Sequence, residues 1–245
     1  IFEDINNWTV GDLDDDASAG MWEVDSPVAT FYESNQAQPG EDHSPNGEKC
    51  FITGAQTSIG SVGFDDVDGG KTTLLSPVFD LSNYNEVLVS YWRWYTNDVG
   101  DNPGTDHWQV YGSSDNWLTS VQLEYTNQSQ AEWINKNFLL SQLGLELSEQ
   151  VQFKFIAEDI YNDGDSGTGG SIVEAAIDDF SVSTFENNDL LLGDLNQDGE
   201  LNVLDVVAMI NIILDNSCSE LSDLNFDSVC NVLDIVLLVS KILEN

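Results

Sequence analysis

The chain has 245 residues and an ordinary share of apolar and aromatic side chains, enough for one large folded domain or two smaller ones. Its charge is extreme, because 44 acidic residues face only six basic ones and give a formal net charge of −38. Nucleic acids and anionic membranes bind clustered Lys and Arg, so the composition argues against both as partners. Bound cations that neutralise carboxylates, or a generally acidic surface, would each account for the excess.

Residues 1 to about 186 have the pattern of an all-β domain. Short runs rich in β-branched and aromatic residues alternate with loops of Gly, Asp, Asn, Ser and Pro. Trp92 and Trp94 are two residues apart, so they would share one face of a strand. Phe153 and Phe155 have the same spacing and would also share a face. Two packed sheets are the natural way to bury strands of this kind. The clearest strands are expected over residues 87–95, 108–112, 151–157 and 172–183.

The pattern changes after residues 187–191, a short polar segment that we interpret as a linker. Residues 192–245 form a second, small α domain in this interpretation and contain two apolar runs. Both runs are shorter than the roughly 20 apolar residues that a membrane-spanning helix needs, so we expect no membrane insertion. The predicted fold class is therefore mainly β with a small α domain.

Two segments, residues 194–205 and 223–234, repeat one twelve-residue pattern. Side chains that carry oxygen occupy positions 1, 3, 5, 9 and 12 of both, the spacing that wraps a hard cation in a loop. We expect one Ca²⁺ in each loop, with the backbone carbonyl of position 7 as a ligand and with Asn202 and Asn231 acting through water. The predicted ligands are Asp194, Asn196, Asp198, Glu200 and Asp205 in the first loop and Asp223, Asn225, Asp227, Val229 and Asp234 in the second.

The helices expected after the loops are apolar on nearly all sides. Only two polar residues interrupt residues 203–214, and only three interrupt residues 232–243. Two short helices packed together cover one stripe on each, so the remainder should meet the β domain or a neighbouring molecule. A simple helix pair with some exposed apolar side chains is the alternative.

The two loops and their helices resemble a dockerin domain, whose repeats lack the first helix of an EF-hand and have Asp at position 12. This resemblance covers residues 192–245 and implies that the domain folds on calcium and docks onto a protein partner. Position 6 of the second loop is Ser228, where the sharp turn favours Gly, so the second site is expected to be weaker. Positions 10 and 11, usually polar contact residues in dockerins that bind cohesins, are apolar here: Val203, Leu204, Val232 and Leu233.

Three cysteines bear on the compartment of the protein. Cys218 precedes the second loop and Cys230 lies within it, twelve residues apart, so they could close a short disulfide. A bridge there would fit an oxidising, extracellular compartment, whereas two buried free thiols are the alternative. Cys50 has no obvious partner.

Several segments of the first domain, from Phe2 and Glu3 to residues 176–180, resemble MAM-like jelly-roll β-sandwiches. Residues 38–45, 68–77 and 91–95 resemble more closely the bacterial domains that are appended to secreted peptidases. In such sandwiches the first and last strands lie side by side, and their acids can share one or more structural Ca²⁺ ions. The alternative is that the last-strand acids merely end a strand and that Asp68 makes a turn. The candidates for this metal site are Glu3, Asp42, Asp68, Asp178 and Asp179.

No catalytic centre can be assembled from the sequence. His43 and His107 do not belong to a metalloprotease motif. Residues 164–167 resemble the nucleophile segment of trypsin-like proteases, but they lack a His or Asp in a matching context and read as a loop. With 44 acids, any pairing of carboxylates is uninformative about glycoside hydrolysis.

The sequence therefore predicts an extracellular or cell-surface, secreted, non-catalytic calcium-binding interaction module. Its C-terminal helices would dock onto a protein partner or a neighbouring copy, so that self-association into a surface layer or filament is one outcome. A carbohydrate-binding module is an alternative, with Trp117 as the most exposed candidate for stacking on a glycan. An accessory domain of a secreted peptidase and a hydrolase with an unrecognised carboxylate pair are the others.

Overall fold

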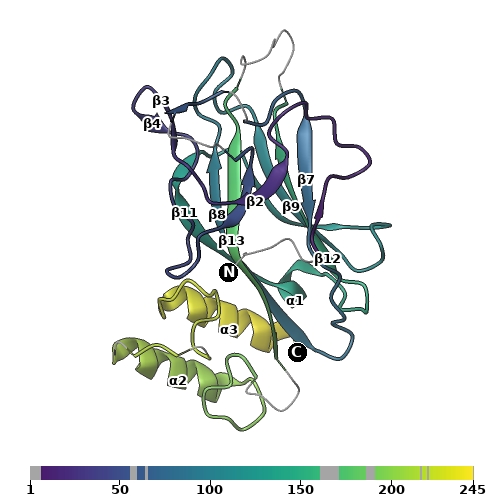
Figure 1. Cartoon of the computed structure of the whole chain (residues 1–245). Coiled ribbons are helices and arrows are strands. Elements are labelled where there is room, and N and C mark those ends of the chain that lie inside the picture. Colours follow the sequence, from purple (N-terminus) through teal and green to yellow (C-terminus); the bar gives the residue numbers. More distant parts are fainter. Residues whose placement is uncertain are drawn as a thin grey trace. The chain divides into compact units, whose positions relative to one another are not determined.

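The computed structural model describes residues 7–55, 60–63, 66–160, 171–185, 191–215, 217–219 and 221–244. The chain divides into two compact units, Ile1–Thr184 and Phe185–Asn245. The first is built of strands and the second of loops and helices (Figure 1). Glu3, residues 164–167 and most of the predicted linker lie outside the described residues.

The first unit contains two five-stranded sheets. One, which we call the β9 sheet, has the order β1 (Thr9–Val10), β7 (Lys71–Leu75), β12 (Gln152–Glu158), β9 (His107–Ser113) and β10 (Val121–Thr126). The other, the β8 sheet, has the order β11 (Gln130–Leu139), β8 (Glu86–Thr96), β13 (Glu174–Phe185), β5 (Cys50–Thr53) and β2 (Trp22–Asp25). A small third sheet joins β4 (Asn35–Gln36), β3 (Thr30–Tyr32) and β6 (Gly60–Ser61), and α1 (Leu140–Leu143) follows β11 directly.

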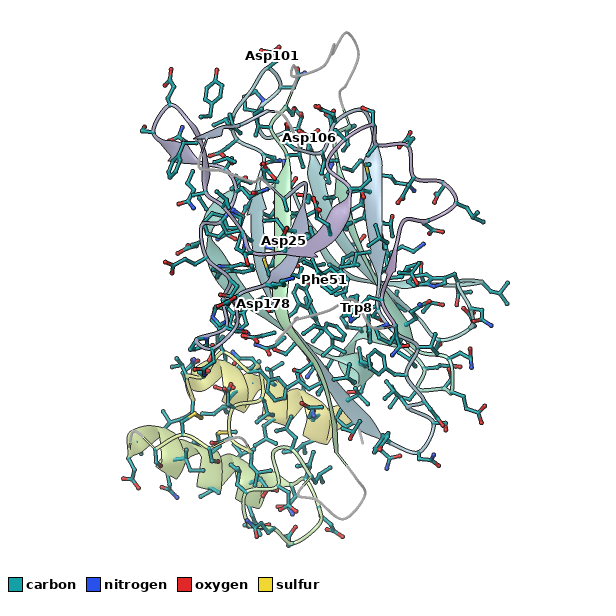
Figure 2. All side chains as sticks on the ribbon, in the orientation of Figure 1. Trp8, Asp25, Phe51, Asp101, Asp106 and Asp178 are labelled. Atoms are coloured by element: carbon teal, nitrogen blue, oxygen red, sulfur yellow. A yellow bond between two sulfur atoms is a disulfide. The ribbon has the colours of Figure 1, made fainter. Side chains whose placement is uncertain are left out.

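The main core of the first unit is made by alternate residues of the long strands. Phe153 and Phe155 of β12 are fully buried in one cluster with Tyr91 of β8 and Trp108 of β9, so the two phenylalanines share a face as predicted. Tyr91 meets Phe155 edge-on at 5.1 Å between ring centroids. Phe51 of β5 closes the cluster against Trp8 at 4.8 Å (Figure 2). The predicted jelly-roll-type β-sandwich is confirmed, with a third sheet and α1 as unpredicted additions.

Two predicted strands begin later than expected. The predicted strand 172–183 is β13 and starts at Glu174, because the N–H of Ile172 bonds to the carbonyl of Val99 outside the main ladder. Val151 forms only an isolated bridge with Phe79, so β12 starts at Gln152.

A loop covers part of the outer face of the β8 sheet. Residues 37–45, which we call the strap, seal a second small cluster that contains Cys50, Ile52, Trp94 and Ala176. The carbonyl of Ala37 accepts hydrogen bonds from Trp94 Nε1 (2.7 Å) and Thr96 Oγ1 (2.9 Å). Buried Gln38 donates to the carbonyls of Thr53 and Gly54 and to Glu174.

The second unit contains α2 (Val203–Leu214) and α3 (Val232–Glu244), each preceded by one of the predicted loops. Met209, Leu224 and Leu238 are fully buried at the centre of this unit. Its small size limits the core to one stripe of each helix, and the remaining helix surface is exposed. In the described part of the chain, no helix is both long and apolar enough to cross a membrane.

Candidate calcium loops and exposed helix faces

The first loop is organised by two buried carboxylates. Asp194, at position 1, accepts hydrogen bonds from the backbone N–H of Asp198 (3.1 Å) and Gly199 (2.7 Å). Asp205, at position 12 in the first turn of α2, accepts three, from the N–H of Leu195 (2.9 Å), Asn196 (3.2 Å) and Asn202 (2.9 Å). The relative exposures of Asp194 and Asp205 are 2% and 0%.

The second loop repeats this arrangement bond for bond. Asp223 accepts from the N–H of Asp227 (3.1 Å) and Ser228 (2.7 Å). Asp234 accepts from the N–H of Leu224 (2.9 Å), Asn225 (3.3 Å) and Asn231 (2.8 Å). The two halves of the second unit are therefore one structural motif used twice.

Position 9 has a role that the sequence analysis missed. The Oδ1 of Asn202 accepts a hydrogen bond from the N–H of Leu204 (2.8 Å), and Asp205 accepts one from the N–H of Asn202 (2.9 Å), which makes a capping box at the start of α2. Asn231 does the same with the N–H of Leu233 (2.8 Å) at the start of α3. The signal was present in the sequence as Asn followed three residues later by Asp.

Two positions in each loop adopt a left-handed backbone. Position 4 has φ of 58° at Gln197 and 57° at Phe226, and position 6 has φ of 84° at Gly199 and 64° at Ser228. Gly adopts this conformation freely, whereas a residue with a Cβ is strained there. The predicted weakness of the second loop therefore has a conformational basis at Ser228.

The donor set of each loop fits Ca²⁺ in its chemistry. Ca²⁺ binds carboxylate, amide and carbonyl oxygens together, and each loop supplies three aspartates, two asparagines and a position-7 carbonyl. In the described part of the chain, no three His, Cys, Asp or Glu side chains converge closely enough to hold a metal by themselves. The fit therefore depends on the amide and carbonyl oxygens as well. Three carboxylates in one short loop repel one another, and backbone N–H groups offset that only in part, so a divalent cation suits the site.

A disulfide ties the segment after α2 to the second loop. Cys218 and Cys230 are bonded, with their Cα atoms 5.4 Å apart. The remaining cysteine, Cys50, is buried under the strap, and burial raises the pKa of its thiol well above the usual value. One structural bridge with one inert thiol fits an oxidising compartment.

The exposed surface of both helices is apolar and repeats in register. Five residues of α2 and five of α3, at identical offsets, are between 37% and 80% exposed. The polar residues exposed among them are Asn211 and Ser240, and the aspartates of both helices, Asp205 and Asp234, are buried. We call these surfaces the paired helix faces: Val203, Leu204, Val207, Ile210 and Leu214 of α2, and Val232, Leu233, Val236, Val239 and Leu243 of α3.

The last-strand acids of the sandwich hold the strap. Asp178 of β13 is fully buried, and its Oδ2 accepts from the N–H of His43 (3.0 Å) and of Ser44 (3.1 Å). Asp179 bonds to Nδ1 of His43 (2.8 Å) and to Oγ of Ser44 (2.6 Å). Burial alone would raise the pKa of Asp179, but these bonds outweigh it and lower that pKa. Asp42 is part of the strap as well. Asp178 is labelled in Figure 2.

Asp68 belongs to another part of the sandwich. Asp68 is buried and forms an isolated β-bridge with Ala19. Its backbone carbonyl accepts a hydrogen bond from the N–H of Ser18 (2.7 Å). Of the five predicted sandwich ligands, Asp178 and Asp179 contact the strap, and Asp42 belongs to the strap. A calcium site made of all five stays a prediction.

Five tryptophans of the sandwich, Trp117 among them, differ in burial. Trp108 and Trp94 are buried, Trp92 is stacked under the ring of His43 at 3.7 Å, and Trp133 meets Trp94 edge-on. Trp117 is half-buried, with Lys154 Nζ 4.4 Å above its ring. Two of these five rings, Trp94 and Trp108, are therefore buried, and the other three are partly exposed.

Comparison with known proteins identifies the second unit. The family model for the Dockerin type I domain matches residues 192–243. No curated protein matched the sequence.

Some solved structures are similar to the chain, at low sequence identity and with TM-scores below 0.5. One is TmCBM61 in complex with β-1,4-galactotriose, at 14% identity and a TM-score of 0.41, with 74% of this chain and 91% of that chain covered. A cleaved adhesin domain of the Lys-gingipain of Porphyromonas gingivalis has 17% identity and a TM-score of 0.42, with 73% and 91% covered. The family 11 carbohydrate-binding module from Clostridium thermocellum has 12% identity and a TM-score of 0.38, with 76% and 94% covered. Residues 192–243 are a dockerin type I domain, and this domain follows a β-sandwich.

Proposed function

We propose that this protein is an extracellular interaction module, and that its second unit, folded around two Ca²⁺ ions, docks onto a protein partner through the paired helix faces. Dockerin domains are non-catalytic, bind Ca²⁺ and bind cohesin partners, and they occur in secreted or cell-surface proteins. The observation that carries the proposal is the repetition of ten exposed apolar side chains at identical offsets on α2 and α3. An apolar surface of this kind on an otherwise acidic chain marks a contact surface.

Calcium acts in this proposal by fixing the helices. Asp205 and Asp234 each bond three loop N–H groups and also lie in the first turn of a helix, so the loop and the helix start share one anchor. Asp194, Asn196, Asp198, Glu200 and Asp205 would hold the first ion, and Asp223, Asn225, Asp227, Val229 and Asp234 the second. Removal of the ions leaves the carboxylates to repel one another and should unfold both helices.

The two units can be followed separately in one experiment. All seven tryptophans lie in the first unit, whereas α2 and α3 supply most of the helix. We expect a chelator to abolish most of the helical circular dichroism and to leave tryptophan fluorescence almost unchanged. Full helicity in chelator would overturn the role of calcium.

Docking is tested with a panel of cohesin domains and with the chain itself, in calcium, by sedimentation velocity. The double variant Val207→Asp, Val236→Asp places charge in both helix faces and should abolish every calcium-dependent complex. Leu118→Asp is the matched control, because Leu118 is an 85% exposed apolar residue of the sandwich. Complexes with cohesins support a separate protein partner, and calcium-dependent oligomers of the chain alone support a neighbouring copy. The proposal would be contradicted if the double variant still formed the complexes, or if the unchanged chain formed no complex with any cohesin or with itself.

A further inference from the structure

The outer face of the β9 sheet carries an organised set of rings and amides. Trp108, Val110, Phe153 and Phe155 point into the core, so the residues that alternate with them point outward. Neighbouring strands bring these outward residues into rows, since Tyr125 pairs with Gln109, and Tyr111 pairs with Gln122. The strands β7, β12 and β9 lie side by side in this sheet (Figure 1). The surface that we call the ring face consists of His107, Gln109, Tyr111, Trp117, Gln122, Tyr125, Gln152 and Glu158.

Hydrogen bonds and stacking hold these side chains in place. Tyr111 Oη donates to Oε1 of Gln109 (2.9 Å), and Gln109 Nε2 donates to Oε2 of Glu158 (2.8 Å). The ring of His107 stacks on Tyr125 with 4.7 Å between centroids. A surface fixed in this way loses little conformational entropy when a ligand binds.

Trp117 is fixed at the end of the same face. Its Nε1 donates to Oε1 of Gln152 (2.7 Å), and both Asn116 and Trp117 adopt positive φ, 57° and 65°. A left-handed backbone at two successive residues is costly, so the loop is built to place this ring. Tyr125, 51% exposed, offers an open ring surface further along the sheet.

The chemistry of the ring face favours a neutral polysaccharide. Aromatic rings provide flat apolar surfaces for the C–H faces of pyranose rings, and amides can both donate to and accept from sugar hydroxyls. The nearby cations are already engaged, because Lys154 pairs with Asp12 and Lys71 pairs with Asp14. With Glu158 on the face and a net charge of −38 on the chain, an anionic glycan would be repelled.

We propose that the ring face binds a neutral polysaccharide chain and is a second binding site, separate from the paired helix faces. The strap partly closes the outer face of the β8 sheet. Residues 12–15 cover the β7 side of the outer face of the β9 sheet, so the ring face is the part of that face toward β9 and β10, where Tyr125 is 51% exposed. The paired helix faces are aliphatic, whereas the ring face combines aromatic and amide groups. These two surfaces suit different classes of ligand.

Affinity electrophoresis and titration calorimetry with mixed-linkage β-glucan, xylan, β-1,4-galactan and polygalacturonate test the proposal on the full chain. We expect binding to at least one neutral polysaccharide and none to polygalacturonate. Tyr125→Ala should weaken that binding about tenfold through loss of one stacked ring. Gln109→Met keeps the side-chain volume, removes the amide hydrogen bonds and should also weaken binding.

Tyr32→Ala is the matched control, because Tyr32 of β3 is 43% exposed but belongs to the third sheet. It should leave affinity unchanged, and unchanged tryptophan fluorescence should show that all variants are folded. Binding should also survive the Val207→Asp, Val236→Asp double change, which separates this site from the proposed docking. Absence of binding to every neutral polysaccharide, a preference for polygalacturonate, or equal loss with Tyr32→Ala would each overturn the inference.

Discussion

Ser228 shows how one side chain can distinguish two otherwise matched calcium loops. It has a φ of 64° at the position where the first loop has Gly199 at 84°. A Cβ built on Gly199 would meet no atom within 4 Å, so the difference between the loops is one of backbone strain rather than of space.

We therefore expect Ser228→Gly to stabilise the second unit by about 0.5–1 kcal/mol, since relief of left-handed strain exceeds the entropy that Gly adds to the unfolded chain. Gly199→Ser should destabilise it by a similar amount. Calcium titrations followed by helical circular dichroism measure both, and the midpoint should move to lower calcium for Ser228→Gly. A shift to higher calcium would show that the Ser228 side chain contributes something that the backbone does not.

Asp178 and Asp179 contact a partner that is distant along the chain. Their place in the last strand, beside the first, predicted a metal site, which stays a prediction, and the structure shows in addition that Asp178 accepts from two backbone N–H groups of the strap. The strap is more than 130 residues away along the chain, as the separations of 135 and 134 residues show. No local pattern identifies a partner at that distance.

Strands β8, β9 and β10 are joined by a buried charged network that links the two sheets. Glu124 of β10 accepts from Tyr91 Oη (2.7 Å), Trp108 Nε1 (2.8 Å) and Arg93 (2.5 Å), and Arg93 is 1% exposed. Lys136 of β11 reaches the same carboxylate at 2.9 Å. Burial, reinforced by the charge of Glu124, raises the pKa of Tyr91 well above its usual value, so Tyr91 remains a donor.

Glu124→Ala should lower the free energy of unfolding of the sandwich by about 3–5 kcal/mol, because it leaves the Arg93 guanidinium buried without its counter-charge. Lys136→Ala is the matched control. Its partly exposed ion pair should be worth less than about 1 kcal/mol. Urea denaturation followed by tryptophan fluorescence measures both, and similar losses for the two variants would show that the buried pair is not what holds the sheets together.

Local sequence patterns predicted the long elements well and the short ones poorly. The helix starts at Val203 and Val232 followed from a repeated motif and a change of periodicity, both of which are local. The third sheet joins strands of only two or three residues through non-local pairs, such as Thr30 with Gly60, so it has no usable period. The ring face was missed for a related reason, since its residues come together only through the register of three strands.

The excess of acidic over basic residues is a property of the whole molecule. Among the described residues, four of the six basic side chains form ion pairs: Lys71, Arg93, Lys136 and Lys154. Two of them fasten the acidic loop after β1, because Lys154 holds Asp12 and Lys71 holds Asp14. Asp15 accepts from the N–H and hydroxyl of Thr73. This acidic stretch is therefore anchored to the sheet, whereas most other carboxylates contribute repulsion.

The response of the sandwich to pH should reflect both effects, with opposite signs. Hydrogen bonds from Lys154 and Lys71 lower the pKa of Asp12 and Asp14, and bonds from the strap lower that of Asp179. A carboxyl group whose pKa is lower in the folded state stabilises the fold above its unfolded pKa, near 3.8, and that contribution is lost as pH falls through the folded value. Between pH 7 and about 5 the anchors stay ionised, while protonation of other acids begins to relieve repulsion.

We therefore expect the melting temperature of the sandwich, measured by tryptophan fluorescence in metal-free buffer, to hold or rise from pH 7 to about 5 and to fall only below about 4. Added NaCl should raise it more at pH 7 than at pH 5, because screening acts on the repulsion that protonation has already reduced. Replacing two anchors, in Asp12→Asn, Asp179→Asn, should lower stability at pH 7 and flatten the fall below pH 4. A melting temperature that drops steadily from pH 7 to pH 5 at low salt would mean that the anchoring bonds, and not the net charge, dominate the electrostatics of the fold.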